Sequence, residues 1–133
     1  MSVPVELSEL RAAVERFGPV AFLLTTAEDG RPHAVSFELR WVDDRLVGAG
    51  GNRTRRNASS RSLVSLLWPA TEAGGYNLIV DGDAALDGDD IVVTPTWAVL
   101  HRSVGMPAPS VDGACGQDCV PLDGTAGSIL TSP

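Results

Sequence analysis

Apolar and polar residues follow regular patterns along the first hundred positions, and these patterns predict a helix followed by strands. Between Leu7 and Phe17 the apolar residues recur every three or four positions and Gly18 follows, which predicts an amphipathic helix that ends at the glycine. The run 20–26 is apolar on both faces and predicts a buried strand. Across 32–42 every second residue faces a core, which predicts a strand with one buried face.

Four more strands complete the predicted series, at residues 45–48, 63–68, 76–86 and 91–101. Gly82 interrupts the third of these four and predicts a bulge or a barrel bend. Pro95 lies in the last one and, because it has no N–H to donate, requires an edge position or a bend. Six strands with short turns, an opening helix and a short helix between the third and fourth strands predict a mainly β fold, a small closed or split barrel.

Glycines and arginines are concentrated between the third and fourth predicted strands. Residues 48–52 read Gly-Ala-Gly-Gly-Asn and predict an irregular loop, and residues 53–60 can then form two helical turns. The helix N-terminus, with either Asn52 or Thr54 as its N-cap, offers unpaired N–H groups and a positive dipole. Glycines allow close backbone approach and arginines add bidentate charge, so this segment predicts a phosphate cradle.

The spacing of the arginines decides which of them can reach one phosphate. Arg53 and Arg56 share a face of the predicted helix, whereas Arg55 points to the other side. We therefore expect Arg53 and Arg56 to bind the phosphate, Thr54 to contribute its hydroxyl and Asn57 to orient the turn. The segment is neither a Walker loop, which requires a lysine, nor a Rossmann loop, because the glycine spacing differs and no βαβ pattern surrounds it.

Composition and charge limit the partners that the chain can have. The 133 residues carry a formal net charge of −7, which opposes general binding to nucleic acids or acidic membranes. Arginine is the only basic residue besides two histidines, and four arginines fall close together without an acid, at positions 53, 55, 56 and 61. This patch indicates a small anionic ligand. Because neither a membrane-spanning run nor a secretory signal pattern is present, we expect a cytoplasmic protein.

The order of these motifs resembles that of a known family. A helix and a strand that ends in an Asp-Gly turn are followed by Gly30-Arg31-Pro32-His33, an alternating strand, the basic turn 53–57 and the segment 63–69, Leu-Val-Ser-Leu-Leu-Trp-Pro. This order is similar to that of the pyridoxamine 5'-phosphate oxidase-like flavoproteins, over about residues 10–101. The resemblance implies a six-stranded split β-barrel that forms a homodimer and binds FMN or the deazaflavin F420 in a groove between subunits.

The resemblance also assigns roles to individual residues. The residues implied at the cofactor are Arg53, Thr54, Arg56 and Asn57 at its phosphate, Gly48, Ala49 and Gly50 alongside it, and Ser36 and Glu38 near its ring. Trp41, Trp68 and Trp97 are expected in the core or at an interface, and Trp68 is the one of the three expected to contact a flat ring, because it lies in the strand that follows the short helix. Thr54 replaces a lysine that many members have, and Glu38 places negative charge near an anionic cofactor, so weak or altered binding is an alternative. No catalytic side chain is assigned, because such a cofactor itself transfers the hydride or electrons.

The remaining reactive side chains predict no second site. His33 shares a strand face with Phe37, so a core or rim position is expected, and His101 is expected at an exposed strand end. Cys115 and Cys119 form neither a CxxC pair nor part of a four-ligand set. We expect free thiols and no metal site, with a metal pair or a regulatory disulfide as the lesser alternative.

The chain is expected to form one cofactor-binding domain, residues 1–102, and a Gly/Pro-rich tail, residues 103–133, that is flexible or packed on the partner subunit. Three functions remain open. The first is an FMN- or F420-dependent oxidoreductase with a small-molecule substrate. The second is a cofactor-binding or sequestering protein of the same fold without turnover, and the third is a structural dimer with an empty groove.

Overall fold

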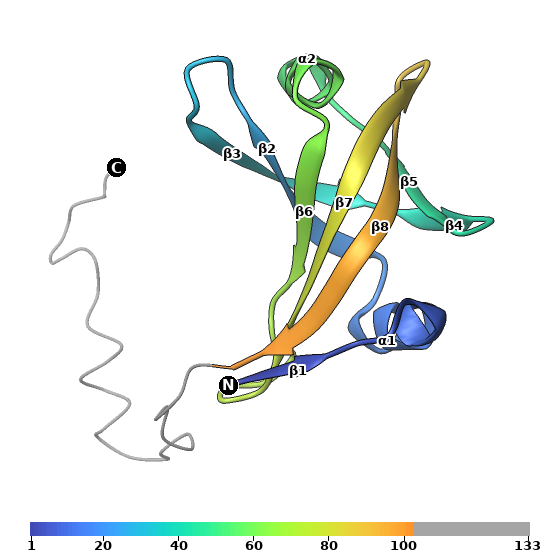
Figure 1. Cartoon of the computed structure of the whole chain (residues 1–133), viewed down its shortest axis with the longest axis vertical. Helices are drawn as coiled ribbons and strands as arrows, with labels where there is room; N and C mark the ends of the chain where they lie inside the picture. The colour runs from blue at the N-terminus through green and yellow to red at the C-terminus, as the bar shows by residue number, and fades with distance from the viewer. Residues whose placement is uncertain (103–133) are drawn as a thin grey trace, which may run out of the picture.

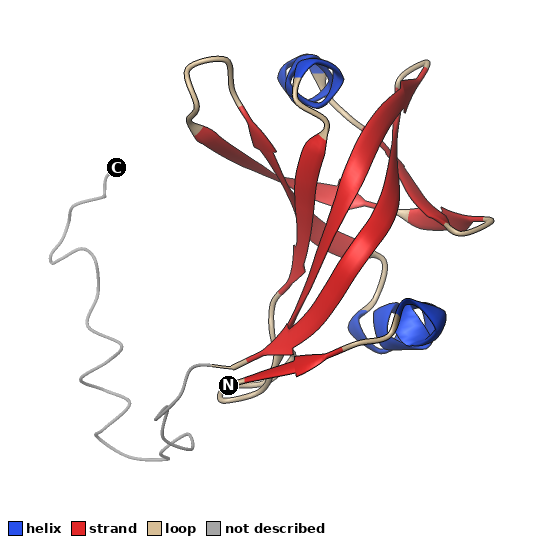
Figure 2. Cartoon of the chain, viewed as in Figure 1, coloured by secondary structure: helices blue, strands red, loops and turns tan. Residues whose placement is uncertain are grey.

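One antiparallel sheet organises residues 1–102, the part of the chain that this computed structural model describes (Figure 1). Its eight strands are β1 (Ser2–Pro4), β2 (Val20–Thr26), β3 (Pro32–Glu38), β4 (Arg40–Val42), β5 (Arg45–Ala49), β6 (Leu63–Trp68), β7 (Asn77–Asp87) and β8 (Asp90–His101). A short 3-10 helix, η1 (Leu7–Glu9), continues into α1 (Leu10–Phe17), and α2 (Asn52–Ser60) connects β5 to β6. Figure 2 shows the strands as the main body, with the helices at opposite ends of it.

The strand order closes the sheet on itself. Neighbouring strands follow the order β3-β2-β6-β7-β8-β5-β4, and β1 adds to β8. The strands β3 and β4 are thus at opposite ends of the order, yet only Leu39 separates them in the chain. The two edges of the sheet must therefore approach each other at Leu39, which curls the sheet into the half-open barrel seen in Figure 1.

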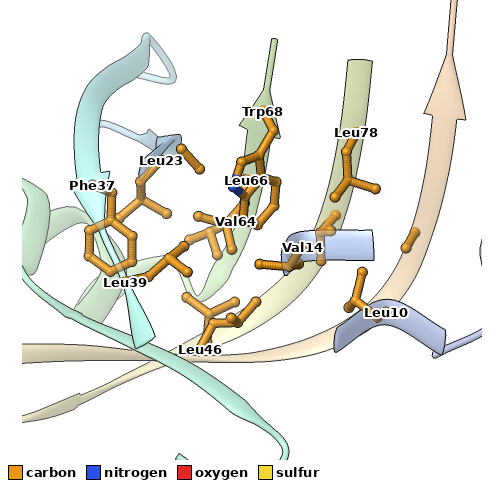
Figure 3. Close-up of a cluster of buried hydrophobic side chains, with 14 of the residues drawn as sticks. Leu10, Val14, Leu23, Phe37, Leu39, Leu46, Val64, Leu66, Trp68 and Leu78 are labelled. Carbon is orange, nitrogen blue, oxygen red and sulfur yellow. The ribbon is translucent and has the colours of Figure 1, made fainter. Parts of the chain in front are cut away.

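The inward faces of the strands enclose the hydrophobic core (Figure 3). Leu23, Phe37, Leu46 and Leu66 come from four different strands, and each side chain is at most 1% exposed. From α1, Leu10 packs into the same cluster. Full burial of a side chain of this size contributes about 1.5–3 kcal/mol to stability, so this core holds the curled sheet and α1 together.

The predicted fold class, a mainly β split barrel with short helices, is confirmed, but the strand count is eight rather than six. The strand β1 was not predicted, and the predicted strand 32–42 divides at Leu39. β3 pairs with β2 whereas β4 pairs with β5, so the chain changes its sheet partner at Leu39. The Leu39 N–H still donates to the Pro19 carbonyl oxygen at 2.8 Å, on the β2 side. The opening helix likewise divides into η1 and α1. At α2 the N-cap is Gly51, rather than Asn52 or Thr54, and no side chain caps it.

The predicted irregularities at Gly82 and Pro95 coincide in the sheet. The register between β7 and β8 shifts between Asp81 and Gly82, and Gly82 pairs with Pro95. On its other edge β8 pairs with β5 up to Val93 and with β1 from Val99 onward, so neither strand requires an N–H from Pro95. A Cβ at Gly82 would lie 2.7 Å from a backbone carbonyl oxygen of β8, so the bulge requires a glycine.

The predicted tail, residues 103–133, lies outside the described residues together with Cys115 and Cys119. No helix within residues 1–102 is long and apolar enough to cross a membrane. The same part of the chain contains no cluster of three or more His, Cys, Asp or Glu side chains that would hold a metal ion.

Candidate functional site

A cationic cleft of about 800 Å³ lies between α2 and the hairpin that joins β2 to β3, two elements that Figure 1 shows at the same end of the barrel. Its charged lining consists of four arginines, one histidine and two acids: Arg31, Arg53, Arg56, Arg61, His33, Glu28 and Asp29. Four guanidinium groups outnumber two carboxylates, so the cleft is positively charged although the whole chain is acidic.

The two faces of α2 explain why Arg53 and Arg56 reach this cleft. Both arginines are exposed, whereas Thr54 is buried and does not line the cleft. Asn57 is also buried, but it lines the cleft beside the two arginines. The Asn57 Nδ2 donates a hydrogen bond of 3.1 Å to Thr25 Oγ1 on β2. This buried bond ties the middle of α2 to the barrel and orients the turn that carries the two arginines.

The other two arginines of the segment make local bonds. Arg55 donates to the Gly50 carbonyl oxygen and, at 2.7 Å, to Asn52 Oδ1, and it does not line the cleft. Its direction away from the cleft agrees with the prediction. Arg61 donates through Nε to the Thr26 carbonyl oxygen at 2.7 Å and does line the cleft. Arg55 thus stabilises the loop before α2, whereas Arg61 is held at the cleft by the end of β2.

None of the cleft arginines forms an ion pair with an acid of residues 1–102. The ion pair present in that part of the chain joins Arg40 to Asp90 at 3.3 Å, outside the cleft. The Asp29 Oδ1 instead accepts a hydrogen bond of 3.0 Å from the backbone N–H of Arg31. The guanidinium groups therefore retain the capacity to bind an anionic ligand.

Two of the residues assigned to the cofactor are placed elsewhere. Thr54 is 3% exposed, faces the barrel and does not line the cleft. Trp68 is 1% exposed, and its Nε1 donates to the Gly18 carbonyl oxygen at 2.9 Å. The structure therefore corrects the expectations that Thr54 contacts a phosphate and that Trp68 contacts a ring, because the core encloses both side chains.

The glycine segment before α2 packs closely against the barrel, and the predicted loop 48–52 is shorter than expected, because Gly48 and Ala49 belong to β5 and Asn52 to α2. A Cβ at Gly48 would collide with the carbonyl oxygen of Glu38 and lie 2.8 Å from the Phe37 ring. A Cβ at Gly50 would collide with a β8 side chain in the same way. Of Gly48, Ala49 and Gly50, only Ala49 is exposed, and none of these residues lines the cleft. Their position alongside a cofactor therefore stays a prediction, whereas their role in packing is visible.

We expect Gly48→Ala to lower the free energy of unfolding by about 1–3 kcal/mol, because the added methyl group overpacks the contact between β5 and β3. Urea denaturation measures this loss. Gly51→Ala is the matched control, since nothing lies within 4 Å of a Cβ there, and it should cost less than about 1 kcal/mol. Equal losses in the two variants would contradict the packing role.

A second cavity, a groove of about 450 Å³, opens on the outer face of the sheet beside the cleft. The strands β2 and β6 pair only as far as Leu24 and Ser65, and beyond these residues they separate. The groove is lined by apolar and polar side chains, among them Leu24, Leu63, Ser65, Asp81 and Thr96. Pro32 lines both cavities, so the cleft and the groove adjoin each other.

Ser36 and Glu38 are exposed on the outer side of β3, as their alternation predicted. Glu38 lies six residues from Pro32 along the strand, about 20 Å away at roughly 3.3 Å per residue. Glu38 does not line the arginine cleft. The approach of Ser36 or Glu38 to a ring stays a prediction.

Sequence reasoning did not place Arg31, Arg61 and His33 in the site. Arg31 and His33 belong to a motif that it had identified, but the order of motifs does not show that this hairpin faces α2. The expected rim position of His33 agrees with its half-buried side chain, whose Nδ1 lies 3.5 Å from Thr25 Oγ1. Thr25 also accepts the bond from Asn57, so His33 and α2 meet at one buried hydroxyl.

Sequence comparison identifies two mycobacterial relatives. An uncharacterized protein of Mycobacterium bovis and one of Mycobacterium tuberculosis are each 39% identical to this chain, over 87% of it and 93% of the relative. No family model matches the chain.

Comparison with solved structures identifies the fold. A candidate pyridoxamine 5'-phosphate oxidase from Listeria innocua superposes with a TM-score of 0.62 at 18% identity, covering 74% of this chain and 100% of that one. An FAD-binding protein from Mycobacterium smegmatis gives 0.55 at 14% identity, over 77% and 100% of the two chains. An F420 reductase gives 0.52 at 18% identity, over 61% and 90%. At these identities the likeness is one of fold.

Proposed function

The chain belongs to the family of the two mycobacterial proteins and has the split β-barrel fold of the pyridoxamine 5'-phosphate oxidase-like flavoproteins, and on this premise we propose that it binds FMN or F420. We propose further that it is a cytoplasmic oxidoreductase that uses this cofactor on a small-molecule substrate. The observation that carries the proposal is the cleft, whose four arginines have no ion-pair partner in residues 1–102 and which adjoins a partly apolar groove.

The geometry of the cleft fits the phosphate of such a cofactor. Arg53 and Arg56 project from the exposed face of α2, and Arg31 projects from the hairpin on the opposite wall. A phosphate between these walls would accept charge-assisted bonds from both sides, and guanidinium groups suit bidentate recognition of phosphate. Four arginines supply more charge than one phosphate needs, which favours F420, because F420 also carries an acidic tail.

The groove fits a flat ring that follows the phosphate. Leu24, Pro32 and Leu63 provide apolar surface, and polar groups lie at its floor. Because Pro32 belongs to both cavities, a ligand with its phosphate at the arginines can extend its ring over β2 and β6. The bound cofactor would supply the hydride or electron transfer, whereas these residues bind it, orient it and exclude water.

We propose that a second copy of the chain covers the outer face of the sheet and completes the groove. Large apolar side chains on this face remain 41–74% exposed: Val20, Phe22, Leu63 and Trp97. The strand register also aligns Phe22 with the half-buried Leu67 and Ile79, so the apolar row crosses three strands. Soluble monomers rarely leave such a continuous apolar face uncovered, which supports a homodimer.

Phe22→Arg is expected to convert the dimer into a monomer, because a charge in the apolar row would be buried without a partner. Sedimentation velocity at several protein concentrations measures the change. Val42→Arg is the matched control, since Val42 is similarly exposed but lies on β4, and this variant should remain dimeric. A wild-type chain that sediments as a monomer would overturn the proposed dimer.

Titration of the purified protein with FMN and with F420, followed by absorbance and fluorescence, tests the proposed function. We expect saturable binding of at least one cofactor, and oxidation of its reduced form when electron acceptors are added. Binding without any acceptor reduction would support the sequestering protein instead. Binding of neither cofactor would overturn the proposal and leave a structural dimer.

A further inference from the structure

Asp81 is a half-buried carboxylate in the groove, and no cation of residues 1–102 pairs with it. It lies on β7 and lines the groove together with Ser65 and Thr96. The ion pair found within these residues joins two other side chains on β4 and β8. Partial removal of a carboxylate from water without a cationic partner opposes folding, so a half-buried carboxylate that faces a cavity indicates a functional role.

Ser65 and the bulge hold this carboxylate in one orientation. The Ser65 Oγ donates a hydrogen bond of 2.6 Å to Asp81 Oδ1, and Thr96 Oγ1 donates to the Asp81 backbone carbonyl oxygen at 3.2 Å. The shift in register between Asp81 and Gly82 lies at the same point, and bulges redirect side chains next to binding sites. No hydrogen bond from residues 1–102 reaches Asp81 Oδ2, so this oxygen can accept one from a ligand.

We propose that Asp81 makes the groove selective for a ring that carries an imide N–H, by accepting a hydrogen bond from this group. The inference rests on the proposed function. FMN and F420 share an imide N–H at the ring edge, and an ionised carboxylate acts only as an acceptor. A bond from this N–H to a carboxylate is charge-assisted and therefore stronger than a neutral one. Ser65 is the positioning residue, since it binds the other carboxylate oxygen.

The test compares Asp81→Ala with Asp83→Ala in the full chain. Asp83 lies two residues farther along β7, is exposed and does not line the groove, so its loss is a matched change of charge. Each protein is titrated with FMN and with N3-methyl-FMN, in which a methyl group replaces the imide hydrogen. Wild type and Asp83→Ala should prefer FMN by about tenfold, and Asp81→Ala should bind the two flavins within about twofold.

F420 is titrated on the same three proteins, and we expect about tenfold weaker binding for Asp81→Ala and no change for Asp83→Ala. Circular dichroism melts establish that the variants fold. Asp81→Leu, which has a similar shape and no hydrogen-bond acceptor, serves if the alanine variant does not fold. The preference of the wild type for FMN over N3-methyl-FMN can be measured without any variant.

The outcomes separate this role from the proposed function. If FMN binds but the wild type does not prefer it over N3-methyl-FMN, the role of Asp81 is overturned and the cofactor site stands. If only F420 binds, equal affinities of the two alanine variants overturn the role in the same way. A wild type that binds neither cofactor overturns both the proposed function and the role of Asp81.

Discussion

Replacement of both Arg53 and Arg56 by alanine is expected to weaken cofactor binding by at least about 100-fold. A hydrogen bond to a charged group contributes about 1.5–3 kcal/mol, so two such bonds to phosphate correspond to a factor of about 100 or more in the dissociation constant. Neither side chain makes a hydrogen bond or an ion pair within residues 1–102, so the fold should be retained. Fluorescence titration with FMN and F420 measures the loss.

The control for this double variant removes two arginines outside the cleft. Arg16 on α1 and Arg45 on β5 are exposed and do not line the cleft, so the Arg16→Ala/Arg45→Ala variant changes the net charge equally. Its affinity should remain within about threefold of the wild type, because long-range attraction alone is weak at physiological salt. A similar loss in both double variants would show that overall charge, rather than the cleft, attracts the cofactor.

Trp68→Ala is expected to lower the free energy of unfolding by about 3–5 kcal/mol, the cost of deleting a large side chain from a packed core. Trp68 is 1% exposed, and its indole N–H bonds to the Gly18 carbonyl oxygen, which would lose its donor. A domain of this size has about 5–15 kcal/mol of stability, so the variant would be marginal. Urea denaturation followed by circular dichroism measures the loss.

Trp97→Ala is the contrasting variant, because Trp97 is half exposed on the outer face of the sheet. The effect of Trp97→Ala on stability should arise through the proposed dimer and should therefore depend on protein concentration. The loss of stability caused by Trp68→Ala should not depend on it. If Trp68→Ala unfolded at the same urea concentration as the wild type, the core position of Trp68 would be contradicted.

Local sequence pattern was sufficient for most strands. The bounds of β2 and β6 agree with the prediction, because their apolar residues are bordered by turn residues. The expectation that β2 is buried on both faces is wrong, because Val20 and Phe22 on its outer face are exposed. The break between β3 and β4 was not predictable in this way. Leu39 continues the alternating pattern, and the strand divides because β3 pairs with β2 whereas β4 pairs with β5 at the other end of the strand order.

Helical geometry was also sufficient to separate the arginines of α2. A rotation of about 100° per residue places Arg53 and Arg56 together and Arg55 apart, and the structure has this arrangement. The same geometry turns Thr54 towards the barrel, which the family resemblance did not take into account. Trp68 was misplaced because the alternation of β6 assigns it a face, but not whether that face is core or surface.

The sequence by itself determined the mainly β fold class, the position of the arginine-rich helix and the separation of its arginines, because each depends on periodicity between near neighbours. The tertiary structure alone decided that Arg31 and Arg61 join α2 in one cleft and that a groove opens beside it. It alone also paired Ser65 with Asp81. These features depend on which distant strands pair and on the closure of the sheet at Leu39. Neither can be deduced from the pattern of neighbouring residues.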